Sequence, residues 1–169
     1  MTALLGKVLL LTGCTAWGLL AGSRLGERAA CLEEFRQALA ALSRELSFSL
    51  RPLWELMTQA AAGSRGPAAA FFRVCCARFA QGGRESWAES WQQALAEVPL
   101  PLTQADRRLL GEAGQVLGRY DGESQRQALA GLLACLEDRR EEARREARRL
   151  FRVYGVLGVT GGLFCLILL

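Results

Sequence analysis

The sequence predicts an all-α fold, a membrane-anchored helical bundle of about six helices between an N-terminal and a C-terminal transmembrane helix. β-Branched residues are scarce, whereas Ala, Leu, Arg and Glu, which favour helices, are abundant. Charged residues make up 22% of the 169 residues, but almost all of them lie between Arg24 and Arg152. We therefore expect a transmembrane anchor over residues 1–22, a helical domain over residues 23–152 and a transmembrane helix over residues 153–169.

The two ends of the chain are nearly uncharged. Residues 3–21 contain one charge, Lys7, and residues 153–169 contain none. Both runs are close to the length of roughly 17–25 residues that a membrane-spanning helix needs. A cleaved signal peptide, or a lipoprotein signal in which Cys14 is acylated, is the alternative for the first run. That run continues past Cys14 to Ala21, which favours an uncleaved anchor.

The distribution of charge predicts the topology. Arginines such as Arg24, Arg28 and Arg152 flank the inner ends of both apolar runs, whereas only Lys7 and the α-amino group lie at the outer ends. By the positive-inside rule, the helical domain is expected in the cytoplasm and both termini outside. Small residues four positions apart let helices approach closely within a membrane. The candidates for such packing are Gly18, Gly22, Gly158 and Gly162.

The helical domain begins with a long helix. Apolar residues recur at a heptad-like spacing from Leu25 to Leu46, which predicts a helix with one apolar stripe. Pro52 interrupts this helix and can open a second, shorter one. Pro67 is placed to begin a third helix, which we expect to run to about Ala80.

Two further short helices are expected before the last long one. The helix over residues 85–97 carries Trp87 and Trp91 on one face. Thr103 is expected to cap the next helix, with Asp106 three residues later supplying the carboxylate of a capping box. The final helix, which begins near residue 123, carries an apolar stripe to the end of the domain. The first and last long helices can therefore pair antiparallel as a stalk, and the short helices form a head.

The composition excludes several kinds of chemistry. The chain has no His and no Asn, so it can hold neither His-based triads, nor His-ligated metal sites, nor N-glycosylation sites. The six cysteines lack C-x-x-C spacing, and the adjacent Cys75 and Cys76 are expected to fill the core. Gly111 and Gly114 lie in a helical pattern and belong to no phosphate-binding loop. We expect no catalytic residue, cofactor, metal, small-molecule substrate or nucleic acid.

Two segments resemble signatures of the stage III sporulation protein AB family. Residues 42–48 (LSRELSF), followed by Pro52 and Leu53, resemble the pattern L-x-x-E-[IL]-x-[YF]…P-L. Residues 114–125 (GQVLGRYDGESQ) resemble the pattern F-G-x-x-L-G-x-x-D-x-x-x-Q, with Ala113 where the family usually has Phe. The resemblance covers the whole chain.

The resemblance implies a non-enzymatic scaffold in the mother-cell membrane around the forespore, within the transenvelope secretion or channel complex of endospore formation. The soluble part is similar to the cytoplasmic helical domains of type II secretion F proteins. By this fold-level analogy, we expect it to dock the stage III sporulation AA-type ATPase and to contact other membrane subunits. A homo-oligomer is compatible with these expectations. The alternative is a channel or export subunit whose transmembrane helices line or gate a pore.

Two exposed regions are candidates for partner binding. One is the turn that carries the second family signature, and the other is the Arg-rich last helix. The candidate residues are Gly118, Asp121, Gln125, Arg139 and Arg140.

Overall fold

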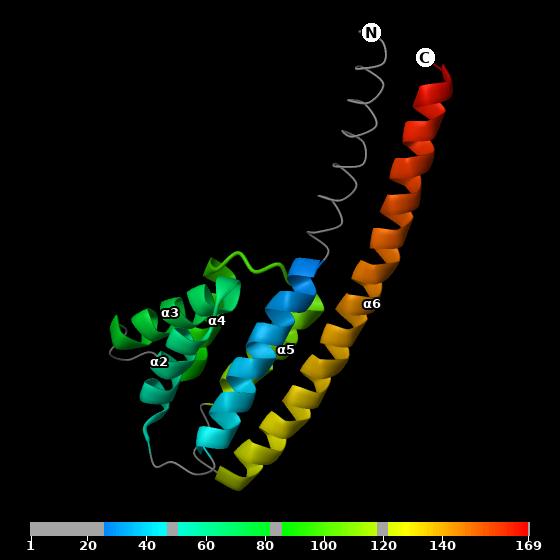
Figure 1. The fold of residues 1–169 in the computed structure, drawn as a ribbon. Coiled ribbons are helices and arrows are strands. Elements are labelled where there is room, and N and C mark those ends of the chain that lie inside the picture. Colours follow the sequence, from blue (N-terminus) through cyan, green and yellow to red (C-terminus); the bar gives the residue numbers. More distant parts are fainter. Residues whose placement is uncertain (1–25, 47–50, 82–85, 118–121, 169) are drawn as a thin grey trace. The chain divides into compact units, whose positions relative to one another are not determined.

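The computed structural model describes residues 26–46, 51–81, 86–117 and 122–168, and within these ranges it describes the side chains except at residues 122–123, 157–159 and 161–168. These ranges contain helices and connecting segments but no strand. A helical segment over residues 26–46 is followed by five labelled helices (Figure 1). They are α2 (Leu53–Gly63), α3 (Gly66–Gln81), α4 (Trp87–Glu97), α5 (Gln104–Leu117) and α6 (Gly122–Leu168). The prediction of an all-α fold is confirmed.

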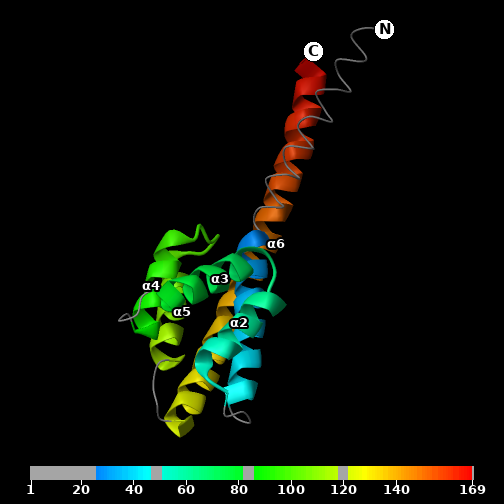
Figure 2. The same ribbon diagram turned by 90° about the vertical axis from the view of Figure 1, so that its left-hand side faces the viewer.

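The chain divides into two compact units. One consists of residues 30–140, which we call the head, and the other of residues 1–29 and 141–169, which we call the terminal unit. Within the head, α2 packs on α3, α3 on α4 and α4 on α5. Figures 1 and 2 show these four short helices gathered beside segment 26–46. The short helices therefore form a bundle on one long helix, as the sequence predicts.

The two long helices of the head run antiparallel. Glu33 pairs with Arg140 of α6 at 2.7 Å, and Arg36 pairs with Glu137 at 3.2 Å. The residue number rises along segment 26–46 as it falls along α6, which is the register of an antiparallel helix pair. In the terminal unit, Arg28 pairs with Glu146 at 3.0 Å.

α6 is one unbroken helix of 47 residues. It therefore passes through the boundary predicted between the helical domain and the C-terminal transmembrane helix without an interruption at residue 152. No helix in the part of the chain that the structure describes is long and apolar enough to cross a membrane. The predicted anchor over residues 1–22 lies outside the described residues, so membrane anchoring stays a prediction.

Aromatic rings fill the centre of the head. The rings of Phe35 and Phe71 lie 5.2 Å apart between centroids, and those of Phe71 and Trp91 lie 4.8 Å apart. These three side chains and Phe72 are fully buried. Burial of side chains of this size contributes the largest favourable terms of the core. The cluster joins segment 26–46, α3 and α4.

Trp91 also joins α4 to α5. Its indole Nε1 donates a hydrogen bond to the carbonyl oxygen of Leu110 at 2.7 Å. Its ring lies so close to Gly114 that a Cβ atom at that position would be 2.4 Å from the ring carbons Cγ and Cδ1. The two helices can approach this closely only because Gly114 has no side chain.

Reciprocal caps begin two of the short helices. The Thr103 amide donates to Asp106 Oδ2 at 3.0 Å, and the Asp106 amide donates to Thr103 Oγ1 at 3.2 Å. This confirms the capping box predicted for α5. Ser86 and Glu89 form a second capping box at α4. Such caps satisfy amide groups that have no partner within the helix.

Candidate functional site

The signature turn is described only at its far end. Gly118 and Asp121 lie outside the described residues. Gln125 lies in the first turns of α6, is 9% exposed, and donates a hydrogen bond from Nε2 to the carbonyl oxygen of Leu117 at 3.1 Å. Leu117 is the last residue of α5, and its carbonyl has no partner within that helix. Gln125 therefore joins α5 to α6 and is buried, contrary to the exposed position that the sequence predicts, and its role in partner binding stays a prediction.

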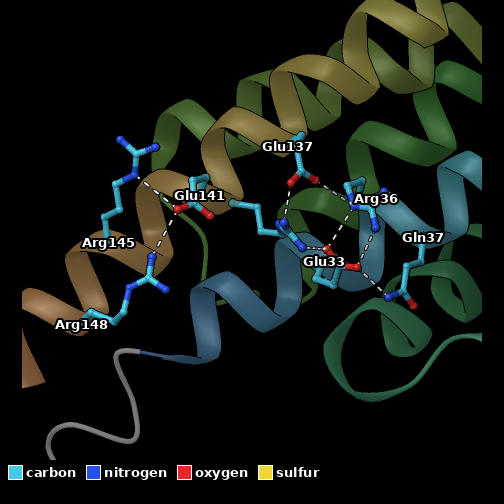
Figure 3. Close-up of polar contacts among 8 residues, drawn as sticks. Glu33, Arg36, Gln37, Glu137, Glu141, Arg145 and Arg148 are labelled. Atoms are coloured by element: carbon cyan, nitrogen blue, oxygen red, sulfur yellow. Dashed lines mark hydrogen bonds and ion pairs between the residues drawn. The ribbon is translucent and has the colours of Figure 1, made fainter.

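Arg140 belongs to a network of four charged side chains. Its guanidinium donates to Glu33 Oε2 at 2.7 Å and also pairs with Glu137. Arg36 donates to both carboxylate oxygens of Glu33, at 2.7 and 3.0 Å. Figure 3 shows Glu33, Arg36 and Glu137 turned toward one another. Arg140, with 15% of its side chain exposed, is thus occupied in holding segment 26–46 on α6.

This network lowers the pKa of Glu33. Hydrogen bonds from Arg36, and also from Gln37 and Arg140, stabilise the charged carboxylate and bring its pKa down from 4.5 to about 2. Glu33 in turn raises the pKa of Arg36. Both groups are therefore ionised over the physiological pH range, and the network acts as a permanent ionic contact.

The other arginines of the predicted Arg-rich region differ in exposure. Arg139 is partly buried and has an interaction partner of its own. In the terminal unit, Glu141 pairs with Arg145 at 3.4 Å and with Arg148 at 3.2 Å, and both arginines are well exposed (Figure 3). Exposed pairs of this kind contribute little to stability.

The glycine candidates for transmembrane packing are not tested by the described contacts. Gly18 and Gly22 lie outside the described residues. Gly158 and Gly162 lie in α6, where only the helical backbone is described. Their role in helix packing stays a prediction.

Two of the cysteines with described side chains are core residues, whereas Cys135 is exposed. Cys31 and Cys75 are buried, and burial raises the pKa of each thiol from 9.0 to about 12. Cys76 is partly buried, and burial raises its pKa too. Thiols with a raised pKa are poor nucleophiles at neutral pH. Among the described residues, no three His, Cys, Asp or Glu side chains are grouped so that they could hold a metal ion.

An aromatic hollow opens between α2, α3 and α4. Its volume is about 470 Å³, and Trp54, Phe79 and Trp87 line it. Trp54 and Phe79 are the exposed large apolar side chains among the described residues of the head. The buried indole N–H of Trp87 has no hydrogen-bond acceptor among those residues. The spacing of these residues in the sequence gave no sign that they meet.

These features define an all-helical domain held together by an aromatic core and by ion pairs between two long antiparallel helices. The sequence model of stage III sporulation protein AB matches residues 3–169, and the chain belongs to this family. Stage III sporulation protein AB of Bacillus subtilis (strain 168) is 26% identical over 171 residues, which cover 100% of this chain and 99% of the relative. A solved structure of stage III sporulation protein AB matches with a TM-score of 0.67 and 26% identity, over 72% of this chain and 97% of that chain.

Proposed function

We propose that this chain is a non-enzymatic scaffold subunit of the complex that joins mother cell and forespore, held in the mother-cell membrane by residues 1–22 and 153–169. Its cytoplasmic head docks the stage III sporulation AA-type ATPase. Family membership supports the place in sporulation, and the arginines that flank both apolar ends support the cytoplasmic placement. The analogy with type II secretion F proteins supports the ATPase as the partner.

The observation that carries the scaffold role is the surface around α2. Trp54 and Thr58 of α2 line the aromatic hollow, whereas Leu56 and Ala60 line a second hollow of about 530 Å³. At 100° per residue these two pairs lie on opposite faces of the helix. A scaffold must hold more than one partner at once, and the head has concave surfaces on both faces of α2.

The test is co-purification of the full chain with the ATPase. Full-length chain in a mild detergent is mixed with purified stage III AA-type ATPase and passed over a size-exclusion column, with an unrelated ATPase as the control. We expect the two proteins to elute together. A helical, monodisperse chain that leaves the ATPase in its own peak contradicts the docking role. Charge reversal at Arg140 is unsuitable for mapping the surface, because it breaks the contact with Glu33.

The alternative is a subunit whose membrane helices line or gate a pore. The observation that favours it is the Gly158-x-x-x-Gly162 spacing on α6, which would let a neighbouring helix approach closely. Substitution of both glycines by Leu distinguishes the two proposals. Loss of transport with intact assembly of the complex supports the pore, whereas unchanged transport supports the scaffold.

A further inference from the structure

The second hollow lies between segment 26–46 and α2, within the head. We call it the acidic groove. Carboxylate side chains line it at two positions of the long helix, and small or apolar side chains line the space between that helix and α2. The residues that matter here are Glu34, Ala38, Glu45, Leu56, Ala60 and Gly63.

The dimensions of the groove suit a helix. Glu34 and Glu45 are eleven residues apart on one helical segment, which corresponds to about 16 Å along the helix axis. Ala38 and Ala60 carry short side chains on the two facing helices, and Gly63 carries none. Short side chains leave room for the ridge of a third helix to enter. A partner helix of about three turns would therefore reach from one carboxylate to the other.

The carboxylate of Glu34 is partly buried, and one of its two oxygens has no hydrogen-bond donor among the described residues. Its Oε2 is buried and has no hydrogen-bond partner in the part of the chain that the structure describes. The preceding residue, Glu33, accepts hydrogen bonds from Arg36, Gln37 and Arg140. A buried acceptor without a donor costs free energy, so its presence in a fold requires an explanation.

The absence of a side chain at Gly66 leaves room for the carboxylate of Glu34. Gly66 has a φ of +52°, and a Cβ atom there would lie 3.1 Å from Glu34 Oε1. Arg65 also lines the groove, but among the described residues it forms no ion pair with Glu34 or Glu45. The groove thus has two carboxylates against one arginine, and it favours a cationic occupant.

We propose that the acidic groove binds an amphipathic helix of the ATPase that carries Arg or Lys at two positions about eleven residues apart. One cation pairs with the partly exposed carboxylate of Glu34, whose covered Oε2 has no donor among the described residues, and the other pairs with Glu45. Small apolar residues of the partner helix pack between them on Ala38 and Ala60. This inference rests on the proposed function for the identity of the partner, and on the groove itself for its chemistry.

The main test compares two double variants of the full chain. E34Q/E45Q removes both charges of the groove and keeps the side-chain shapes. The matched control E112Q/D138N removes two exposed carboxylates outside the groove. We expect E34Q/E45Q to weaken binding of the ATPase at least about tenfold and the control to change it less than about twofold.

A structural role of Glu34 would show in the stability of the chain. Glu34→Gln removes the charge of a partly buried carboxylate that has no ion-pair partner among the described residues, so we expect the thermal midpoint of this variant to stay equal or rise. Loss of binding at an unchanged or higher midpoint supports the proposal. If E34Q/E45Q binds the ATPase with unchanged affinity, the proposal for the acidic groove is overturned. The docking of the ATPase by the head is then still supported. Binding lost only together with the fold also overturns the proposal for the acidic groove.

A second probe separates failure of the groove from failure of ATPase docking. The probe is a synthetic 16-residue alanine-based helical peptide with Arg at positions 3 and 14. If the ATPase does not bind the wild-type chain, the proposed function fails. The peptide then tests whether the acidic groove binds a basic helix. Peptide binding that falls at least about tenfold in E34Q/E45Q, and not in E112Q/D138N, supports a groove for basic helices. Equal binding to all three proteins overturns it.

Discussion

Gly114→Ala tests the close contact between α4 and α5. The new methyl carbon would lie 2.4 Å from Cγ and Cδ1 of the Trp91 ring, about 1 Å closer than an ordinary van der Waals contact. The ring cannot turn away at low cost, because Trp91 is fully buried and packs against Phe71 and Phe72. Either the ring or α5 must move, and this movement weakens the hydrogen bond from Trp91 Nε1 to the carbonyl oxygen of Leu110.

The magnitude follows from three terms. Overpacking of a dense core costs about 1–3 kcal/mol, and a weakened buried hydrogen bond adds about 1 kcal/mol. Replacing Gly by Ala inside a helix returns about 1 kcal/mol. The free energy of unfolding should therefore fall by about 2 kcal/mol, which lowers the thermal midpoint by roughly 6 °C in a chain of this length. Circular dichroism at 222 nm on the full chain in detergent measures this shift.

Two other glycines serve as controls. At Gly111 a Cβ atom would meet Nε2 of Gln92 at 2.7 Å, which is the far end of a flexible and exposed side chain. When the Gln92 side chain moves away, its hydrogen bond from Nε2 to the carbonyl oxygen of Gly111 at 3.2 Å is lost, and this loss offsets the gain of about 1 kcal/mol from replacing Gly in a helix. Gly111→Ala should therefore change the unfolding free energy by less than about 0.5 kcal/mol. At Gly131 of α6 no atom lies within 4 Å, so Gly131→Ala should stabilise by about 1 kcal/mol. A midpoint of Gly114→Ala at or above that of the wild-type chain would refute the reasoning.

Three further changes test the ionic network, the cap of α5 and the placement of the thiols. The folded state lowers the pKa of Glu33 to about 2. Its contribution to the free energy of unfolding is therefore complete above its unfolded pKa of 4.5 and disappears as the pH falls toward 2. Glu33→Gln should therefore lower the free energy of unfolding by about 1 kcal/mol at pH 7. The thermal midpoint of this variant should also fall less between pH 4.5 and 2 than that of the wild-type chain, and an equal fall in both proteins contradicts this. In urea denaturation, Asp106→Ala should lower the free energy of unfolding by about 1–2 kcal/mol, since the Thr103 amide loses its acceptor, and a loss below about 0.5 kcal/mol contradicts the cap. Iodoacetamide at pH 8 should label the exposed Cys135 and spare the buried Cys75, as peptide mass spectrometry can verify, and equal labelling would show that Cys75 is accessible.

Local patterns in the sequence predict the helices well. Pro52 ends one helical pattern and precedes α2, and the Thr103 to Asp106 spacing predicts the cap of α5. The face of α4 that carries Trp87 and Trp91 is the buried face. Each of these features depends on residues within a few positions of one another, so a short stretch of sequence contains everything that determines the feature.

Contacts between distant helices could not be predicted in the same way. The sequence places Gly114 in a family-like signature and in a helical pattern. It does not predict that the ring of Trp91 packs against this glycine. The hollow lined by Trp54 and Phe79 likewise forms only when α2 and α3 pack together. Gln125 belongs to the predicted turn, and its bond to Leu117 shows that a polar signature residue can serve the joint between two helices.

Two adjacent glutamates show where prediction from the sequence ends. Glu33 and Glu34 have the same side chain, and both lie on the same helical segment. A helix turns by 100° per residue, so the two carboxylates face different neighbours. Glu33 meets Arg36 and Arg140, and its charge is compensated within the chain. Glu34 instead faces a groove whose only arginine forms no ion pair with it among the described residues. The first carboxylate therefore stabilises the fold, whereas the second has neither an ion pair nor a donor for Oε2 among the described residues. A carboxylate in this state can be stabilised by a cationic partner, and this is the physical basis on which such a partner can be recognised.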